Sequence, residues 1–121
     1  MKLKIRTITD HGHDSERIAI DVEQDTNLNE YILLDTTYKN GQLSNKDRHP
    51  YLFPDQKVKK GDVVVLLTKK GINTTESKAN GSVIYFFYWG LDSNVWNNDG
   101  DSASLLHIDE RQSHRVTIVK K

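Results

Sequence analysis

The chain has 121 residues, of which 36% are hydrophobic and 28% charged, and its 17 Lys and Arg residues balance its 17 Asp and Glu residues. This length fits one domain spanning residues 1–121, with enough chain for a single hydrophobic core. The zero formal net charge gives no overall field that would steer the chain towards a polyanion. The sequence has no cysteine, which excludes disulfides, thiolate zinc sites and cysteine nucleophiles.

The N-terminal residues alternate basic and apolar side chains and lack the apolar core of a signal peptide. The longest apolar runs, residues 63–67 and 83–89, are far shorter than a membrane-spanning helix. We therefore expect a cytoplasmic protein without a membrane span. The lack of cysteine suits that compartment.

A period of two residues dominates the first part of the chain. It predicts strands at residues 2–8 and 17–23, and in the second of these Ile18, Ile20 and Val22 share the buried face. Continuous apolar runs at residues 30–36 and 63–68 predict strands that are buried more deeply. We find no apolar stripe with the 3.6-residue period of a helix.

An aromatic stretch at residues 82–89 predicts another strand, and Trp96 precedes an Asn/Asp/Gly turn at residues 97–101. A short apolar strand is predicted at residues 103–108. We expect these two strands to pair as a β-hairpin that is held in the core by Trp96. A last strand is predicted at residues 114–119.

Glycine follows Asn, Lys or Asp between several of the predicted strands, at positions where a positive φ is expected. Short strands separated by such turns predict an all-β fold. We expect an antiparallel β-sandwich of about seven to nine strands. The glycine turns are Asn40-Gly41, Lys60-Gly61, Lys70-Gly71, Asn80-Gly81 and Asp99-Gly100.

Several pieces of the sequence resemble the lamin-tail family, whose domains occur at the tail of nuclear lamins and in many bacterial proteins. The Trp-Asn-Asn-x-Gly-Asp turn at residues 96–101 is the most specific piece, and the likeness covers roughly residues 17–108. The chain departs from the family pattern at residues 43–46, where Leu-Ser-Asn-Lys replaces the usual Gly-Trp segment. The other pieces are Tyr31-Ile32-Leu33-Leu34-Asp35, Phe53-Pro54-Asp55 and the Gly61-Asp62 lead-in to the apolar run.

This resemblance implies an immunoglobulin-like antiparallel β-sandwich that serves as an interaction or targeting module. It carries over no catalytic residue and no cofactor, so we expect a non-enzymatic domain that binds a protein partner. The sequence also contains no Gly-x-Ser-x-Gly setting, phosphate-binding glycine loop or His-Glu-x-x-His motif.

Residues 48–54 concentrate two aromatic side chains between two prolines, which favour extended backbone. Arg48 and Tyr51 are the predicted contact residues of this segment, because interfaces favour Arg and aromatic side chains. Leu52 and Phe53 are predicted to plug one end of the sandwich.

The aromatic strand at residues 82–89 has rings on both of its faces. Alternation places Phe86 and Tyr88 on one face and Tyr85, Phe87 and Trp89 on the other. One face either forms an exposed platform or is covered by a loop or a second chain, and a homodimer through this sheet is one alternative. Tyr88 and Trp89 are therefore also candidate contact residues.

Two other function classes remain open at this point. Lys57, Lys59 and Lys60 would form a basic patch for nucleic acid if Lys69, Lys70, Lys120 and Lys121 lay nearby, although lysines at turns also keep strands soluble.

His11 and His13 would suit a metal-dependent, jelly-roll-like enzyme if a third ligand joined them, although a solvated polar loop is the favoured interpretation. The oxygen-rich turn at residues 97–101 invites a calcium interpretation, but it fails the spacing of an EF-hand and is a strong turn former by itself.

Overall fold

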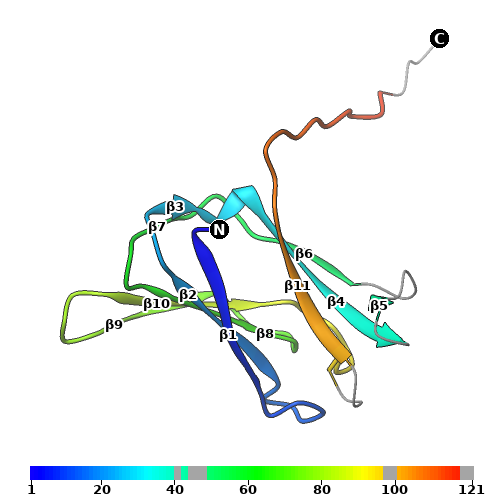
Figure 1. Cartoon of the computed structure of the whole chain (residues 1–121), viewed down its shortest axis with the longest axis horizontal. Helices are drawn as coiled ribbons and strands as arrows, with labels where there is room; N and C mark the ends of the chain where they lie inside the picture. The colour runs from blue at the N-terminus through cyan, green and yellow to red at the C-terminus, as the bar shows by residue number, and fades with distance from the viewer. Residues whose placement is uncertain (40–41, 44–48, 97–100, 118–121) are drawn as a thin grey trace.

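The computed structural model describes residues 1–39, 42–43, 49–96 and 101–117, and this part of the chain is all-β. Its larger sheet is mixed, with the strand order β1-β2-β8-β10-β9 (Figure 1). These strands are β1 (Leu3–Thr9), β2 (Arg17–Val22), β8 (Val63–Leu67), β9 (Thr74–Ser77) and β10 (Val83–Tyr88).

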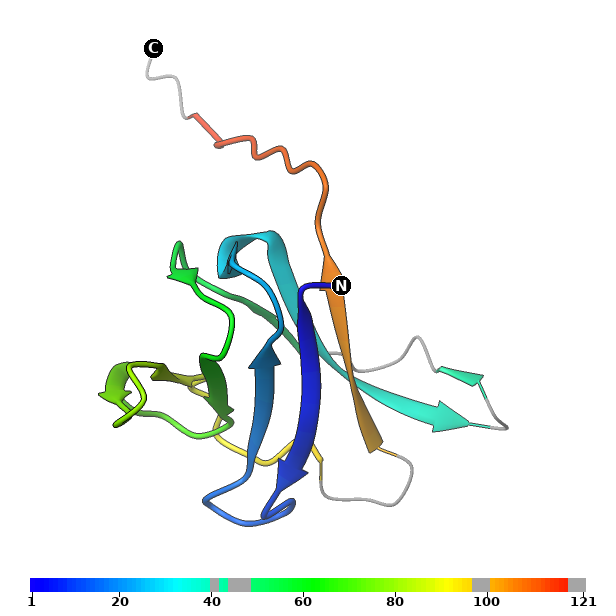
Figure 2. The same cartoon turned by 60° about the vertical axis from the view of Figure 1, so that its left-hand side comes forward.

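The second sheet is built around β4 (Tyr31–Lys39), which pairs with three other strands, all antiparallel. These are β5 (Gln42–Leu43), β6 (Pro50–Leu52) and β11 (Asp101–His107). A separate two-stranded ribbon joins β3 (Thr26–Asn27) to β7 (Lys57–Val58), and a 3₁₀ turn, η1 (Leu28–Glu30), leads into β4. The two sheets lie on opposite sides of one core (Figure 2).

The core follows from the alternation seen in the sequence. In β2 the side chains of Ile18, Ile20 and Val22 are buried, as predicted. Strand β8 is buried on both faces over residues 63–66, which agrees with its continuous apolar run. The second sheet contributes Tyr31 and Leu33 from the inner face of β4. The inner faces of both sheets therefore pack together around one hydrophobic cluster.

Six of the predicted strands are confirmed, but two features of the predicted architecture are not. Strands β8 and β10 pair in parallel, so the larger sheet is mixed instead of antiparallel. Strand β9 follows β8 in the chain but forms the edge of the sheet. Strand β10 then lies between β9 and β8, antiparallel to β9 and parallel to β8. The described residues also hold more strand segments than the predicted seven to nine, because several have only two or three residues.

The predicted hairpin between the aromatic strand and the next apolar strand is wrong. Strand β10 pairs with β8 and β9, whereas β11 pairs with β4 in the other sheet. The chain after β10 therefore crosses from one sheet to the other. Trp96 is buried on this crossing, as predicted, and its indole Nε1 donates a hydrogen bond to Ser102 O at 2.9 Å.

The strand predicted at residues 114–119 is also wrong over its described part. Residues 114–117 form no strand and are exposed, and residues 118–119 lie outside the described ranges. Within the described residues, no helix is long and apolar enough to cross a membrane.

Glycine has two different roles in the described turns. Gly61 and Gly81 have φ values of +96° and +86°, so the prediction of a positive φ is confirmed there. Gly71 has no positive φ; a Cβ atom at this position would lie 2.7 Å from Tyr88 Cγ, and closer still to Cδ1. Gly71 is therefore required by the packing of the Tyr88 ring. The turns at Gly41 and Gly100 lie outside the described residues.

Candidate functional site

The outer face of the second sheet carries an exposed apolar row. Ile32 of β4 pairs with Leu52 of β6 on one side and with Leu106 of β11 on the other. Side chains that lie directly opposite in antiparallel strands point to the same face. The exposed fractions of Leu52 and Leu106 are 47% and 46%, while Ile32 between them is partly buried. We call Leu52, Ile32 and Leu106 the outer apolar row.

The alternation of β4 explains why this row faces outwards. Tyr31 and Leu33 are buried in the core, so Ile32 and Leu34 point to the opposite face. In β11 the same alternation turns Ala103 and Leu105 towards the core. Leu106 must therefore point away from it.

Polar hydroxyl groups border the row along the same two strands. Leu34 pairs with Pro50 and Ser104, and Thr36 pairs with Ser102. The Thr36 hydroxyl lies 2.7 Å from Ser102 Oγ and 3.3 Å from Ser104 Oγ. Across residues 32–36, 50–52 and 102–106 the outward side chains are uncharged. The face is thus apolar at one end and hydroxyl-rich at the other.

Tyr51, a predicted contact residue, lies in an aromatic cluster on the inner side of the second sheet. Its ring contacts those of Phe53, Phe87 and Trp89, with centroid distances of 4.9, 6.5 and 6.0 Å. Burial raises the pKa of the Tyr51 phenol above its ordinary value near 10. Phe53 is buried, which confirms half of the predicted plug, but Leu52 points outwards. Arg48 lies outside the described residues.

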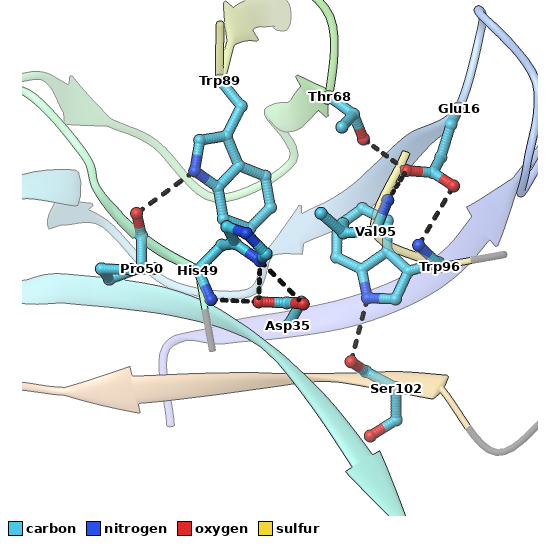
Figure 3. Close-up of polar contacts among 9 residues, drawn as sticks. All are labelled: Glu16, Asp35, His49, Pro50, Thr68, Trp89, Val95, Trp96 and Ser102. Carbon is cyan, nitrogen blue, oxygen red and sulfur yellow. Dashed lines mark hydrogen bonds and ion pairs between the residues drawn. The ribbon is translucent and has the colours of Figure 1, made fainter. Parts of the chain in front are cut away.

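Trp89, another predicted contact residue, joins this cluster to the crossing segment. Its ring centroid lies 5.7 Å from that of Trp96, and its indole Nε1 donates a hydrogen bond to Pro50 O at 3.2 Å (Figure 3). Tyr88 lies on the other face of β10, where Gly71 packs against its ring and Asn73 Oδ1 accepts its backbone N–H at 3.0 Å. The sequence did not determine whether the face of β10 that carries Phe86 and Tyr88 is exposed or covered. In the structure, residues 71–73 cover part of it.

The predicted basic residues that the structure describes are exposed but lie in two separate places, and Lys120 and Lys121 lie outside the described ranges. Two carboxylates hold the turn before β8: Asp62 Oδ2 accepts Lys59 N–H at 2.8 Å, and Asp25 Oδ1 accepts Lys60 N–H at 2.9 Å. The other described lysine pair follows the far end of β8, where Lys70 forms an ion pair with Asp92. Lys57, Lys59 and Lys60 thus lie at one end of β8, and Lys69 and Lys70 at the other.

The candidate metal ligands His11 and His13 lie in the exposed loop between β1 and β2. His13 N–H donates to Asp10 O at 3.0 Å, and His13 O accepts Glu16 N–H at 2.9 Å. Among the described residues, no group of three or more His, Asp or Glu side chains is arranged to hold a metal ion. The calcium interpretation concerned residues 97–101, of which residues 97–100 lie outside the described ranges.

The same loop ends in a buried carboxylate, Glu16, whose burial was not predicted from the sequence. The Glu16 side chain is fully buried and accepts four hydrogen bonds. Figure 3 shows those that Thr68, Val95 and Trp96 donate. Oε1 accepts the Thr68 hydroxyl at 2.7 Å and Val95 N–H at 3.0 Å. Oε2 accepts Gly12 N–H at 2.9 Å and Trp96 N–H at 3.2 Å. Glu16 therefore fastens the crossing segment to the start of β2 and the end of β8, two interior strands of the larger sheet.

A histidine–carboxylate pair lies where β4 meets the start of β6. His49 Nδ1 lies 3.1 and 3.2 Å from Oδ1 and Oδ2 of Asp35, and Oδ1 also accepts the backbone N–H of His49 (Figure 3). Such a pair can orient an imidazole as a base when a nucleophile lies nearby. Among residues 1–39, 42–43, 49–96 and 101–117, no Ser or Thr hydroxyl is hydrogen-bonded to this imidazole. The pair anchors the entry to β6.

No protein-family model and no curated protein matches this chain. Its function is therefore inferred from its own geometry, and the outer apolar row is the candidate functional site.

Proposed function

We propose that this chain is a non-catalytic binding domain that contacts a partner protein through the outer apolar row. The observation that carries this proposal is the exposure of two leucines beside Ile32 on one sheet face. Apolar side chains that gather on the face of a sheet, with a polar border, are typical of protein-binding surfaces. We further propose that the two sheets form an immunoglobulin-like sandwich of the lamin-tail kind.

The chemistry of this face favours a protein over a nucleic acid. Binding to a phosphate backbone requires Lys or Arg side chains, and the outward side chains of residues 32–36, 50–52 and 102–106 are all uncharged. Apolar side chains of a partner would be buried against Leu52 and Leu106. The partly exposed hydroxyls of Ser102 and Ser104 would accept or donate hydrogen bonds at the rim, whereas Thr36 is buried beneath them.

The test is a capture experiment with single charged substitutions in the row. We expect Leu52→Glu and Leu106→Glu each to reduce retention of the specific partner at least about tenfold, because the substitution places an unpaired carboxylate in the contact. Ile72→Glu is the matched control, because Ile72 is also an exposed apolar residue, at 88% exposure, but lies in the loop before β9. Thermal unfolding verifies that all three variants fold.

The partner that supports the proposal is retained by the unaltered chain and by Ile72→Glu, and is lost from both leucine variants. A partner that all four proteins retain equally contradicts the proposal. If both leucine variants fold and bind an oligonucleotide in a salt-sensitive manner, that result contradicts the proposal and favours nucleic-acid binding by the surface lysines.

A further inference from the structure

The segment after β11 leaves the body of the protein. Residues 109–117, which we call the C-terminal arm, are exposed and form no strand. Figures 1 and 2 both show this arm extending away from the two sheets. Two contacts hold its base: Ile108 N–H donates to Glu30 O at 2.7 Å, and Arg111 Nη1 donates to Asn29 O at 3.3 Å.

The end of the arm has the alternating sequence pattern of a β-strand. His114 and Val116 alternate with Arg115 and Thr117, and Val116 is 81% exposed. β-branched residues in such a pattern favour a paired strand, and a strand requires a second chain segment for its backbone hydrogen bonds. The end of the arm therefore has the pattern of a strand, but the described residues of one copy provide no strand that pairs with it.

The order of charges along the arm is complementary to itself. Asp109, Glu110 and Arg111 come first, and His114 and Arg115 follow after the uncharged Gln112 and Ser113. If two arms pair antiparallel with Gln112 opposite Gln112, then Asp109 lies opposite Arg115 and Glu110 opposite His114, while Arg111 faces the uncharged Ser113. Opposite charges at facing positions stabilise antiparallel pairs, and like charges destabilise them. A parallel pair in register would place each charge opposite its own kind.

We propose that the C-terminal arm pairs antiparallel with the arm of a second copy of this chain, about a two-fold axis near Gln112. The occupant is a second copy because the acidic start of the arm faces the basic end of an identical arm that runs in the opposite direction. The balanced charge of the whole chain adds no general repulsion between copies. This pairing is independent of the outer apolar row, which it leaves on the surface of each copy.

Sedimentation equilibrium of the full chain over a range of concentrations tests this pairing. We expect a monomer–dimer equilibrium that weakens with added salt. The double variant Asp109→Arg/Glu110→Arg should weaken self-association at least about tenfold, and so should His114→Glu/Arg115→Glu, because each makes the facing charges alike. An equimolar mixture of the two variants should restore dimers, because each variant then faces its complement.

Glu76→Arg is the control, since Glu76 is an exposed residue of the edge strand β9 and its reversal should leave the equilibrium unchanged. An unaltered chain that stays monomeric at all accessible concentrations overturns the proposal. So does a dimer that neither double variant weakens, or one that the mixture fails to restore.

Discussion

Replacing Glu16 with Gln removes one of the two acceptor oxygens that hold the crossing segment. Each carboxylate oxygen accepts two hydrogen bonds, so an amide nitrogen in either position leaves two donors without an acceptor. A buried donor without a partner costs about 1–3 kcal/mol, which gives about 2–6 kcal/mol for two. Removing the buried negative charge relieves part of this cost. We therefore expect Glu16→Gln to lower the free energy of unfolding by about 2–4 kcal/mol.

Urea unfolding measures this loss directly, and thermal unfolding should show a melting temperature lower by roughly 8–16 °C, at about 4 °C per kcal/mol for a chain of this size. Hydrogen exchange should show the largest loss of protection at the Val95 and Trp96 amides, which donate to the carboxylate. The control Glu76→Gln changes an exposed residue and should stay within about 0.5 kcal/mol of the unaltered chain. A Glu16→Gln variant that is as stable as this control would refute the reasoning.

Two further predictions concern the aromatic residues. Gly71→Ala should destabilise the fold by about 1–3 kcal/mol, because the added Cβ would overlap the Tyr88 ring. This destabilisation should vanish when Tyr88 is also replaced by Ala. An unchanged loss of stability in the Tyr88→Ala background contradicts this packing. The raised pKa of Tyr51 means that the folded state keeps its proton after the unfolded state has lost it, so stability should fall as the pH rises above about 10. Urea unfolding at about pH 9 and about pH 11 should show a smaller fall for Tyr51→Phe, and an identical fall in both proteins would contradict the assignment.

The strands that could be predicted are those whose own sequence determines their burial. Ile18, Ile20 and Val22 alternate because one face of β2 packs on the core, and β8 is apolar throughout because it lies inside its sheet. The parallel pairing of β8 with β10 has no such local signal. It depends on where β9 lies, and β9 is exposed at all four positions, without apolar alternation. Short strands such as β3 and β7 exist only because their partners lie beside them.

The two errors near the C-terminal end have a common physical origin. A strand pattern records the tendency of a segment to pair and contains no information on the partner. The predicted partner of β11 is the preceding long strand, β10, whereas its partner in the structure is β4. Residues 114–117 have the same kind of pattern, and the described part of one copy offers them no neighbour.

The candidate site could not be predicted from the sequence either, because a strand pattern does not identify the neighbouring strands. The alternation of β4 does place Ile32 and Leu34 on one face, and this much could have been deduced. The outer apolar row also requires the register that brings Leu52 and Leu106 beside Ile32. The buried hydrogen bonds of Glu16 likewise join residues far apart in sequence, and Glu16 itself has the appearance of a solvated loop residue.

The pairing of β11 with β4 has a consequence for biosynthesis. A chain emerges from the ribosome N-terminal end first, so β4 is present long before residues 101–107 are translated. During that interval one edge of β4 has open backbone groups, which are a template for pairing with other nascent chains. Closing such a distant pair is slow compared with forming a local hairpin. Translation rate and chaperone supply should therefore affect the yield of this protein more than that of a domain built from successive hairpins.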